Sequence, residues 1–324
     1  MYEDMDLLRA LLFLSREAPT SRQEAYLTEV LASSENREIL LREADLRLTA
    51  PVALDHVIRL TPFAPADNVA LWRKARQRHV ARAMFFVSEM VEFHRLCIAA
   101  TAARHVFVKG PSLAEQFYRN PFFRQCRDID VLVAVQDVEK VVRTARGYGY
   151  TFAGLSFEDI SYRGDEALEA VIRLSDVITL RSPKGVYFEV HKTLDRNAGV
   201  FDSRALLDAS EPRPFHGVEV RVLPAELAFC YVVYHSAQHT WARLNWFTDV
   251  HAILSSPSFD RGECVGLANG FGLSNLIRAS MAIDDWCSAG AEDVRELEPG
   301  AREIYAMLRT NINGGLATEK ELML

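Results

Sequence analysis

Apolar residues recur along the first hundred residues at intervals of three and four, the spacing of an amphipathic helix. Pro51, Pro62 and Pro65 separate the helical stretches, and residues 67–103 contain neither proline nor glycine. The N-terminal region is therefore predicted to be helical, with a long helix at its end.

The pattern changes at about residue 104. Short apolar runs bounded by Gly, Pro or Asp predict strands over residues 106–108, 129–135, 171–180, 186–190 and 218–223. Helical spacing covers residues 137–147, and the segments 182–185 and 214–217 have the composition of hairpin turns. Helical spacing returns at Pro224 and covers residues 225–254, 261–270, 274–289 and 299–312.

This order of elements predicts an α+β fold. A small mixed β-sheet core over residues 104–223 is flanked by an N-terminal helical region, 1–103, and a C-terminal helical bundle, 224–324. A chain of 324 residues is long enough for more than one folded unit.

Composition narrows the functional classes. The net charge of -7 argues against a surface built for long nucleic acid. Five widely separated cysteines without metal-ligand spacing indicate reduced thiols. The first residues are acidic where a signal peptide is basic, and no apolar run approaches about 18 residues. We expect a cytoplasmic protein that does not act at a membrane.

Two carboxylates open the second predicted strand. Asp128 and Asp130 occupy alternate positions, so their side chains project from the same face, about 7 Å apart at the backbone. Two neighbouring carboxylates repel each other and are costly to bury unless a cation lies between them. Mg²⁺ suits such a position because it takes oxygen ligands and keeps sites open for substrate phosphates.

A third acid lies on the predicted strand 186–190. Glu189 and His191 share a face of that strand. If this strand lies beside that of Asp128, the three carboxylates can hold one or two Mg²⁺ ions for an in-line phosphoryl displacement.

The chain resembles the DNA polymerase β-like nucleotidyltransferase superfamily and, more narrowly, a bacterial family of uncharacterised nucleotidyltransferases. The resemblance covers roughly residues 105–250 and rests on four motifs: Lys109-Gly110-x-Ser112, Arg124-x-x-Arg127-Asp128-Ile129-Asp130-Val131-Leu132-Val133, Gly149-Tyr150, and Glu189-Val190-His191.

The resemblance implies a role for each matching position. Gly110 and Ser112 match a turn that holds the NTP triphosphate at a helix N-terminus. Asp128 and Asp130 match the metal-binding pair, and Glu189 matches a carboxylate that activates the acceptor hydroxyl. Pro111 between Gly110 and Ser112, and Glu in place of the usual Asp at 189, depart from the superfamily's pattern.

Three cations lie beside these motifs. Lys109 ends the first predicted strand, where it is either a phosphate ligand or an exposed strand-end residue. Arg124 and Arg127 precede the metal strand, where one of them contacts a phosphate or both form surface ion pairs with the acids.

A polar stripe is predicted on the helix 225–254. His235, His239, Arg243 and Asp249 fall near one another around this helix. Zinc is disfavoured because the motif lacks the Glu of His-Glu-x-x-His. The remaining interpretations are a cleft lining that contacts nucleotide or acceptor, together with His191, and a set of packed structural residues.

The expected activity is Mg²⁺-dependent transfer of NMP from an NTP, such as ATP, to a small-molecule or peptide acceptor, with release of pyrophosphate. An aminoglycoside-type small-molecule nucleotidyltransferase and a non-catalytic nucleotide-binding partner protein are the alternatives. Acceptor identity and nucleobase preference depend on pocket shape rather than on the metal residues.

Overall fold

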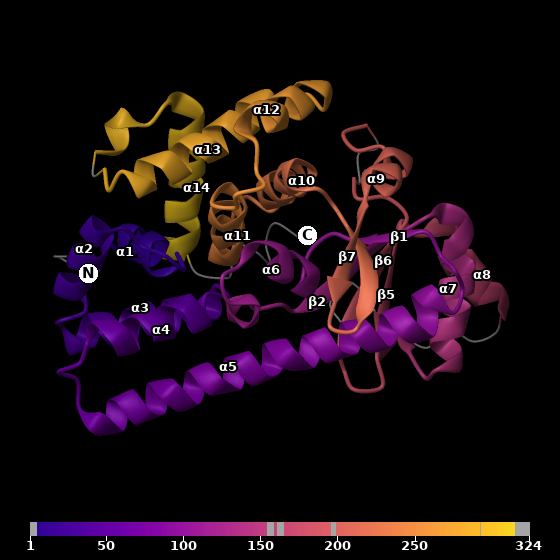
Figure 1. Cartoon of the computed structure of the whole chain (residues 1–324), viewed down its shortest axis with the longest axis horizontal. Coiled ribbons are helices and arrows are strands. Elements are labelled where there is room, and N and C mark those ends of the chain that lie inside the picture. Colours follow the sequence, from indigo (N-terminus) through magenta and orange to yellow (C-terminus); the bar gives the residue numbers. More distant parts are fainter. Residues whose placement is uncertain (1–4, 154–158, 161–164, 196–198, 292, 315–324) are drawn as a thin grey trace. The chain divides into compact units, whose positions relative to one another are not determined.

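The computed structural model describes residues 5–153, 159–160, 165–195, 199–291 and 293–314. It confirms the predicted α+β class: one mixed sheet and many helices (Figure 1). The chain folds into two compact units. The helical unit comprises Met1–Ala81, Phe117–Gln125 and Ala225–Leu324, and the sheet unit comprises Arg82–Gln116 and Cys126–Pro224. The division into three regions at 104 and 224 stays a prediction.

The sheet unit contains a sheet with the strand order β4-β3-β5-β6-β2-β1-β8-β7. Its strands are β1 His105–Phe107, β2 Asp128–Val133, β3 Thr151–Ala153, β4 Asp159–Ile160, β5 Val177–Arg181, β6 Tyr187–His191, β7 Glu211–Phe215 and β8 Val218–Val222. Four helices accompany them within this unit: α6 Pro111–Phe117, which ends at the unit boundary, α7 Val135–Gly147, α8 Asp165–Leu174 and α9 Ser203–Ala209. The long helix α5, Ala66–Phe93, ends in this unit and continues as the π-helix η1, His94–Ala99.

Strand pairing fixes which residues meet. Strands β2 and β6 are parallel neighbours, with Asp130 opposite Glu189 and Leu132 opposite His191. Strand β5 pairs with β6 in antiparallel register, and Gly185 closes the predicted hairpin turn by donating its backbone N–H to the carbonyl oxygen of Ser182, at 2.9 Å. The predicted adjacency of the two acidic strands is thus present.

Alternation along these strands separates the core from the polar residues. Ile129, Val131 and Phe188 are buried in one apolar cluster with side chains of α7 and of the end of α5. The ring of Phe93 stacks on that of Phe188 with 4.3 Å between centroids. Asp130 and Glu189 occupy the intervening positions, so packing of the apolar face places both acids on the opposite face.

The helical unit contains the start of α5 and the remaining helices. These are α1 Leu7–Leu14, α2 Ser21–Val30, α3 Ser34–Leu46, α4 Ala50–Leu60, η2 Pro121–Phe123, α10 Ala225–Gln238, α11 Leu244–Leu254, α12 Arg261–Gly270, α13 Ser274–Ser288, η3 Val294–Glu296 and α14 Pro299–Gly314. Their limits agree closely with the predicted C-terminal helices after residue 260. Within the described residues, no helix has the length and apolarity needed to span a membrane.

Two predicted elements were wrong in their limits. The run 171–180 is a helix end and a strand: α8 continues to Leu174 and β5 starts only at Val177. The run 225–254 is interrupted because Thr240 and Trp241 have positive φ values of 50° and 56°, a left-handed conformation that a helix interior does not allow. His239 and Arg243 therefore lie in the connection between α10 and α11, and the four polar residues do not share one helix.

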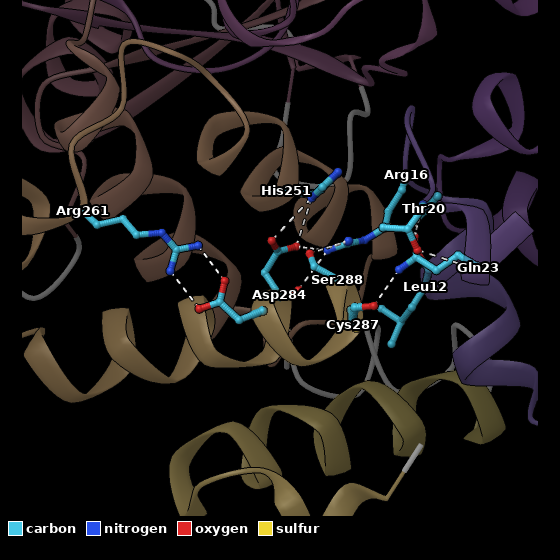
Figure 2. A network of polar contacts seen from close by, with 11 residues as sticks. Leu12, Arg16, Thr20, Gln23, His251, Arg261, Asp284, Cys287 and Ser288 are labelled. Atoms are coloured by element: carbon cyan, nitrogen blue, oxygen red, sulfur yellow. Dashed lines mark hydrogen bonds and ion pairs between the residues drawn. The ribbon is translucent and has the colours of Figure 1, made fainter. Parts of the chain in front are cut away.

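A buried polar network ties α1 to α13 within the helical unit (Figure 2). Arg16, 1% exposed, donates hydrogen bonds to the carboxylate of Asp284 and to the hydroxyl oxygen of Ser288. The Nδ1 atom of His251 lies 3.1 Å from the same carboxylate. Gln23 of α2 donates to the backbone carbonyl of Cys287, at 2.6 Å. These bonds satisfy a buried charge inside the unit and hold sequence-distant helices together.

Candidate metal and nucleotide site

Two acids and a histidine converge on the polar face of β2 and β6. One ligand atom from each of Asp130, Glu189 and His191 lies within 4.8 Å of the other two. Asp130 is almost fully buried, whereas the side chain of Glu189 is 25% exposed. The group therefore has a buried end and an end that solvent or a ligand reaches.

Lys109 adds a cation to this group. Its Nζ atom lies 3.1 Å from Oδ1 of Asp130, and Nε2 of His191 lies at the same distance from that oxygen. The Nε2 atom of His191 is also 3.4 Å from Oε2 of Glu189. Two basic side chains thus face two carboxylates, and Asp130 is their common partner.

The turn after β1 places Lys109. Gly110 has a φ of +75°, a left-handed conformation that favours glycine. A Cβ at this position would lie 3.7 Å from the carbonyl oxygen of Asp128, so the turn runs close to the start of β2. Ser112 is buried at the start of α6, and its hydroxyl donates to the carbonyl oxygen of Lys109, at 3.0 Å. This turn thus brings the end of β1 beside the acids.

Electrostatics in the group favour a charged histidine. Burial lowers the pKa of His191, but hydrogen bonds and charge interactions with Asp130 and Glu189 outweigh this and raise the pKa to about 9. His191 is therefore an imidazolium at neutral pH, and it draws the two carboxylates toward one point.

The donor set of this group fits a divalent cation. Two carboxylates supply the oxygen ligands that Mg²⁺ and Mn²⁺ take, and an imidazole is accepted by Mn²⁺ and softer ions once it loses its proton. A divalent cation would also replace charge that Lys109 and His191 now provide around Asp130. Mg²⁺, the metal expected from the sequence, is thus compatible with the residues present.

Asp128 and Arg127 lie at the start of the same strand. Asp128 is half-buried, projects from the same face as Asp130, and stands opposite Tyr187 in the register. Arg127 is exposed. Its role in phosphate binding and the role of Asp128 in metal binding stay predictions.

Arg124 has a different environment from Arg127. It is buried in the helical unit and donates from Nε and Nη2 to the two carboxylate oxygens of Asp249, each at 2.8 Å. The hydroxyl of Tyr118 donates to Oδ1 of Asp249, at 2.6 Å. The sequence identified Arg124 and Asp249 as separate candidates, and the fold makes them partners of each other.

Three other predicted residues gather around an indole in the helical unit. The rings of His235 and His239 are 4.7 Å apart and lie 5.3 and 5.5 Å from that of Trp246. The guanidinium of Arg243 lies over the same indole at 5.6 Å. The sequence analysis missed Trp246, although its position three residues after Arg243 and seven after His239 was a usable signal.

His191 was placed among the cleft-lining residues and not with the metal group. The structure brings it into contact with Asp130 and Glu189. The signal was available, because His191 alternates with Glu189 on one strand face. What was missing was the register that brings Asp130 level with Glu189.

Paired acids on adjacent strands, beside a glycine turn that carries a lysine, form a site of the kind that the resemblance to nucleotidyltransferases implies. Residues 33–286 match the model of a family described as uncharacterised nucleotidyltransferase, and the chain belongs to this family. No curated protein matches the chain.

Proposed function

We propose that the sheet unit carries out Mg²⁺-dependent transfer of NMP from an NTP to a hydroxyl group of a small-molecule or peptide acceptor, with release of pyrophosphate. The observation that carries this proposal is the convergence of Asp130, Glu189 and His191, with ligand atoms within 4.8 Å of one another. Family membership supports nucleotidyl transfer as the reaction class.

Asp128, Asp130 and Glu189 are the residues that would hold one or two metal ions. When bound, the metal supplies positive charge for the triphosphate and the leaving pyrophosphate. His191 contributes by orienting both carboxylates through its contacts with Asp130 and Glu189. Loss of the proton from the His191 imidazolium on metal binding would offset part of the positive charge that the metal adds.

The triphosphate is assigned to the turn after β1 and to Arg127. The ammonium of Lys109 now has Asp130 as its counter-ion. A metal bound by that carboxylate would leave the ammonium to bind a phosphate oxygen instead. The backbone of Gly110 and the start of α6 at Ser112 supply N–H groups for the same anion. Arg127 is a better phosphate ligand than Arg124, since it is exposed and Arg124 is buried against Asp249.

Glu189 is the proposed general base. It is the more exposed carboxylate of the group and is the one that an acceptor hydroxyl can approach. In this role it accepts the hydroxyl proton while the acceptor oxygen attacks the α-phosphorus and pyrophosphate leaves. His235, His239 and Arg243 are proposed to bind nucleotide or acceptor groups, whereas Asp249 is proposed to hold Arg124.

The first test is calorimetric titration of each of the four NTPs, with and without Mg²⁺, into the wild type and Asp130→Asn. We expect metal-dependent binding of at least one NTP that is lost in the variant. Asp208→Asn, at an exposed position of the same unit, is the matched control and should bind as the wild type does. Absence of binding for all four NTPs would contradict the proposal.

Pyrophosphate release by the wild type separates an enzyme from a non-catalytic nucleotide-binding protein, which releases none. Glu189→Gln then tests the base, because an enzyme that uses Glu189 should lose transfer in this variant. Transfer at the wild-type rate by Glu189→Gln, measured as pyrophosphate release once an acceptor is in hand, would remove Glu189 from the reaction.

A further inference from the structure

The long helix α5 (Figure 1) contains a segment with basic residues and no acidic ones. Between Asn68 and Ser88 the sequence has five Lys or Arg residues and no Asp or Glu, in a chain whose net charge is -7. The part of this segment in the helical unit includes Arg73, Lys74 and Arg78. This local excess of positive charge contrasts with the acidic character of the whole chain.

The three cations are exposed and have no carboxylate partner among the residues that the structure describes. Arg76, two residues after Lys74 on the same helix, differs because it pairs with Asp55. Other exposed arginines of this unit are also paired, among them Arg42 with Glu43, Arg59 with Glu24 and Arg261 with Asp285. These three pairs contrast with Arg73, Lys74 and Arg78, which lie within six residues of one another.

An exposed apolar side chain accompanies the cations. Leu71 is 64% exposed and lies three residues before Lys74 and seven before Arg78, so the three share one helix face. Large apolar groups next to arginines are typical of protein–protein contact surfaces.

We propose that this basic face, formed by Leu71, Lys74 and Arg78, docks an acidic polypeptide segment that also carries apolar side chains. Charge complementarity identifies the sign of the partner, and the exposed leucine requires an apolar group on it. This docking surface is independent of the proposed reaction in the sheet unit.

Other anionic partners fit the face less well. A nucleic acid would find no ring for base stacking on this face, because its apolar residue is the aliphatic Leu71. A second copy of the chain in a symmetric contact would place like charges of the two basic faces against each other. An acidic peptide segment supplies carboxylates for Lys74 and Arg78 and an apolar side chain for Leu71.

The test measures fluorescence anisotropy of a labelled glutamate–tyrosine copolymer, an acidic polypeptide with apolar rings, on addition of the full chain at low salt. Lys74→Gln/Arg78→Gln should weaken binding about tenfold, since two attractive charges are lost. Arg42→Gln/Arg59→Gln removes the same charge from exposed, paired positions and should change affinity less than about twofold. Leu71→Ser should weaken binding severalfold with no change in charge.

Four results would overturn the proposal. These are absence of copolymer binding, equal weakening by both double variants, tighter binding of polyuridylic acid than of the copolymer, and self-association in sedimentation that Lys74→Gln/Arg78→Gln abolishes. The third would identify a nucleic-acid surface, and the fourth would identify a contact between copies. Because all the substituted side chains are exposed, thermal unfolding should be nearly unchanged, which separates lost docking from lost folding.

Discussion

Buried acids occur in both units of this protein, but they have different partners. In the helical unit, Asp249 accepts two hydrogen bonds from one arginine, and Asp284 is enclosed by Arg16 and His251. In the sheet unit, Asp130 shares its face with a second carboxylate, Glu189, and their partners are a lysine and a histidine. Asp249 and Asp284 of the helical unit are thus each bound by an arginine, whereas Asp130 of the sheet unit belongs to a group of four.

The difference separates a structural arrangement from a functional one. An arginine that donates hydrogen bonds to both carboxylate oxygens of one acid forms a pair of fixed geometry in which each charge neutralises the other. Two acids at hydrogen-bond distance from one histidine repel each other, and folding must overcome that repulsion. Such a cost is understandable at a site that binds a cation. Substitution of the acids of the sheet unit should therefore reduce activity, and substitution of the paired acids of the helical unit should reduce stability.

The largest expected effect is on catalysis. Asp130→Asn removes a metal-ligand charge at the centre of the group, and we expect transfer to fall by about 1,000-fold or more. The variant should keep its circular dichroism spectrum, because asparagine preserves the shape of the side chain. Asp208→Asn serves as the control, and an active Asp130→Asn enzyme would show that the metal lies elsewhere.

The next effect concerns stability in the helical unit, where α13 offers an internal control. Asp284 is buried and Asp285 is exposed, and each pairs with an arginine (Figure 2). Asp284→Ala leaves Arg16 buried without its main counter-ion, and we expect a loss of about 3–5 kcal/mol in the free energy of unfolding. Asp285→Ala should change it by less than about 0.5 kcal/mol. Equal effects in urea denaturation would refute the distinction.

How far the sequence predicted each site follows from the range of its contacts. Asp130 and Glu189 were predicted to lie together because strand alternation is local and the two strands were recognisable, whereas His191 was predicted to line the cleft. The pairing of Arg124 with Asp249 was not predicted, since 125 positions separate them and only tertiary packing brings them together. The contact of Lys109 with Asp130 was not predicted for the same reason: it depends on the path of the turn at Gly110, and the sequence left Lys109 as either a phosphate ligand or an exposed strand-end residue.

Fold prediction failed where local and tertiary preferences conflict. Apolar residues run through 171–180 without a change that marks where the helix ends and the strand begins. The interruption of the helix at Thr240 and Trp241 has no Gly or Pro to announce it. In both cases periodicity located the buried residues but could not show whether the backbone there is helix, strand or turn.

The third prediction concerns a buried histidine that lies near other basic groups. His105 at the start of β1 is 7% exposed, and burial together with His94 and Arg221 lowers its pKa to about 4, although Nδ1–H of its ring donates a hydrogen bond to the carbonyl oxygen of Ala103. The folded chain keeps this ring neutral, whereas the unfolded chain protonates it below about pH 6.5. Stability is therefore full above pH 6.5 and falls as the pH approaches 4.

Between pH 6.5 and pH 5 we expect His105 to account for a loss of about 2 kcal/mol in the free energy of unfolding. Urea denaturation at several pH values should show this slope in the wild type and a flatter one in His105→Phe. An unchanged slope in His105→Phe would assign the acid sensitivity to other groups.

The smallest expected effect is on metal affinity, and it tests whether Lys109 occupies the place of the metal at Asp130. Lys109 occupies the Oδ1 atom of Asp130 at 3.1 Å, so a divalent cation must compete with its ammonium for that oxygen. Lys109→Met keeps most of the side-chain length and removes the charge. We expect Mn²⁺, measured by electron paramagnetic resonance without nucleotide, to bind about tenfold more tightly to this variant.

The same substitution should weaken NTP binding, because the proposed phosphate ligand is lost. Opposite changes for metal and nucleotide distinguish competition at Asp130 from a general disturbance of the site, which would weaken both. Lys184→Met is the matched control, since Lys184 pairs with Glu89 and Glu92 in the same unit and should affect neither ligand. Weaker Mn²⁺ binding in Lys109→Met would instead mean that the lysine holds the carboxylates in place for the metal.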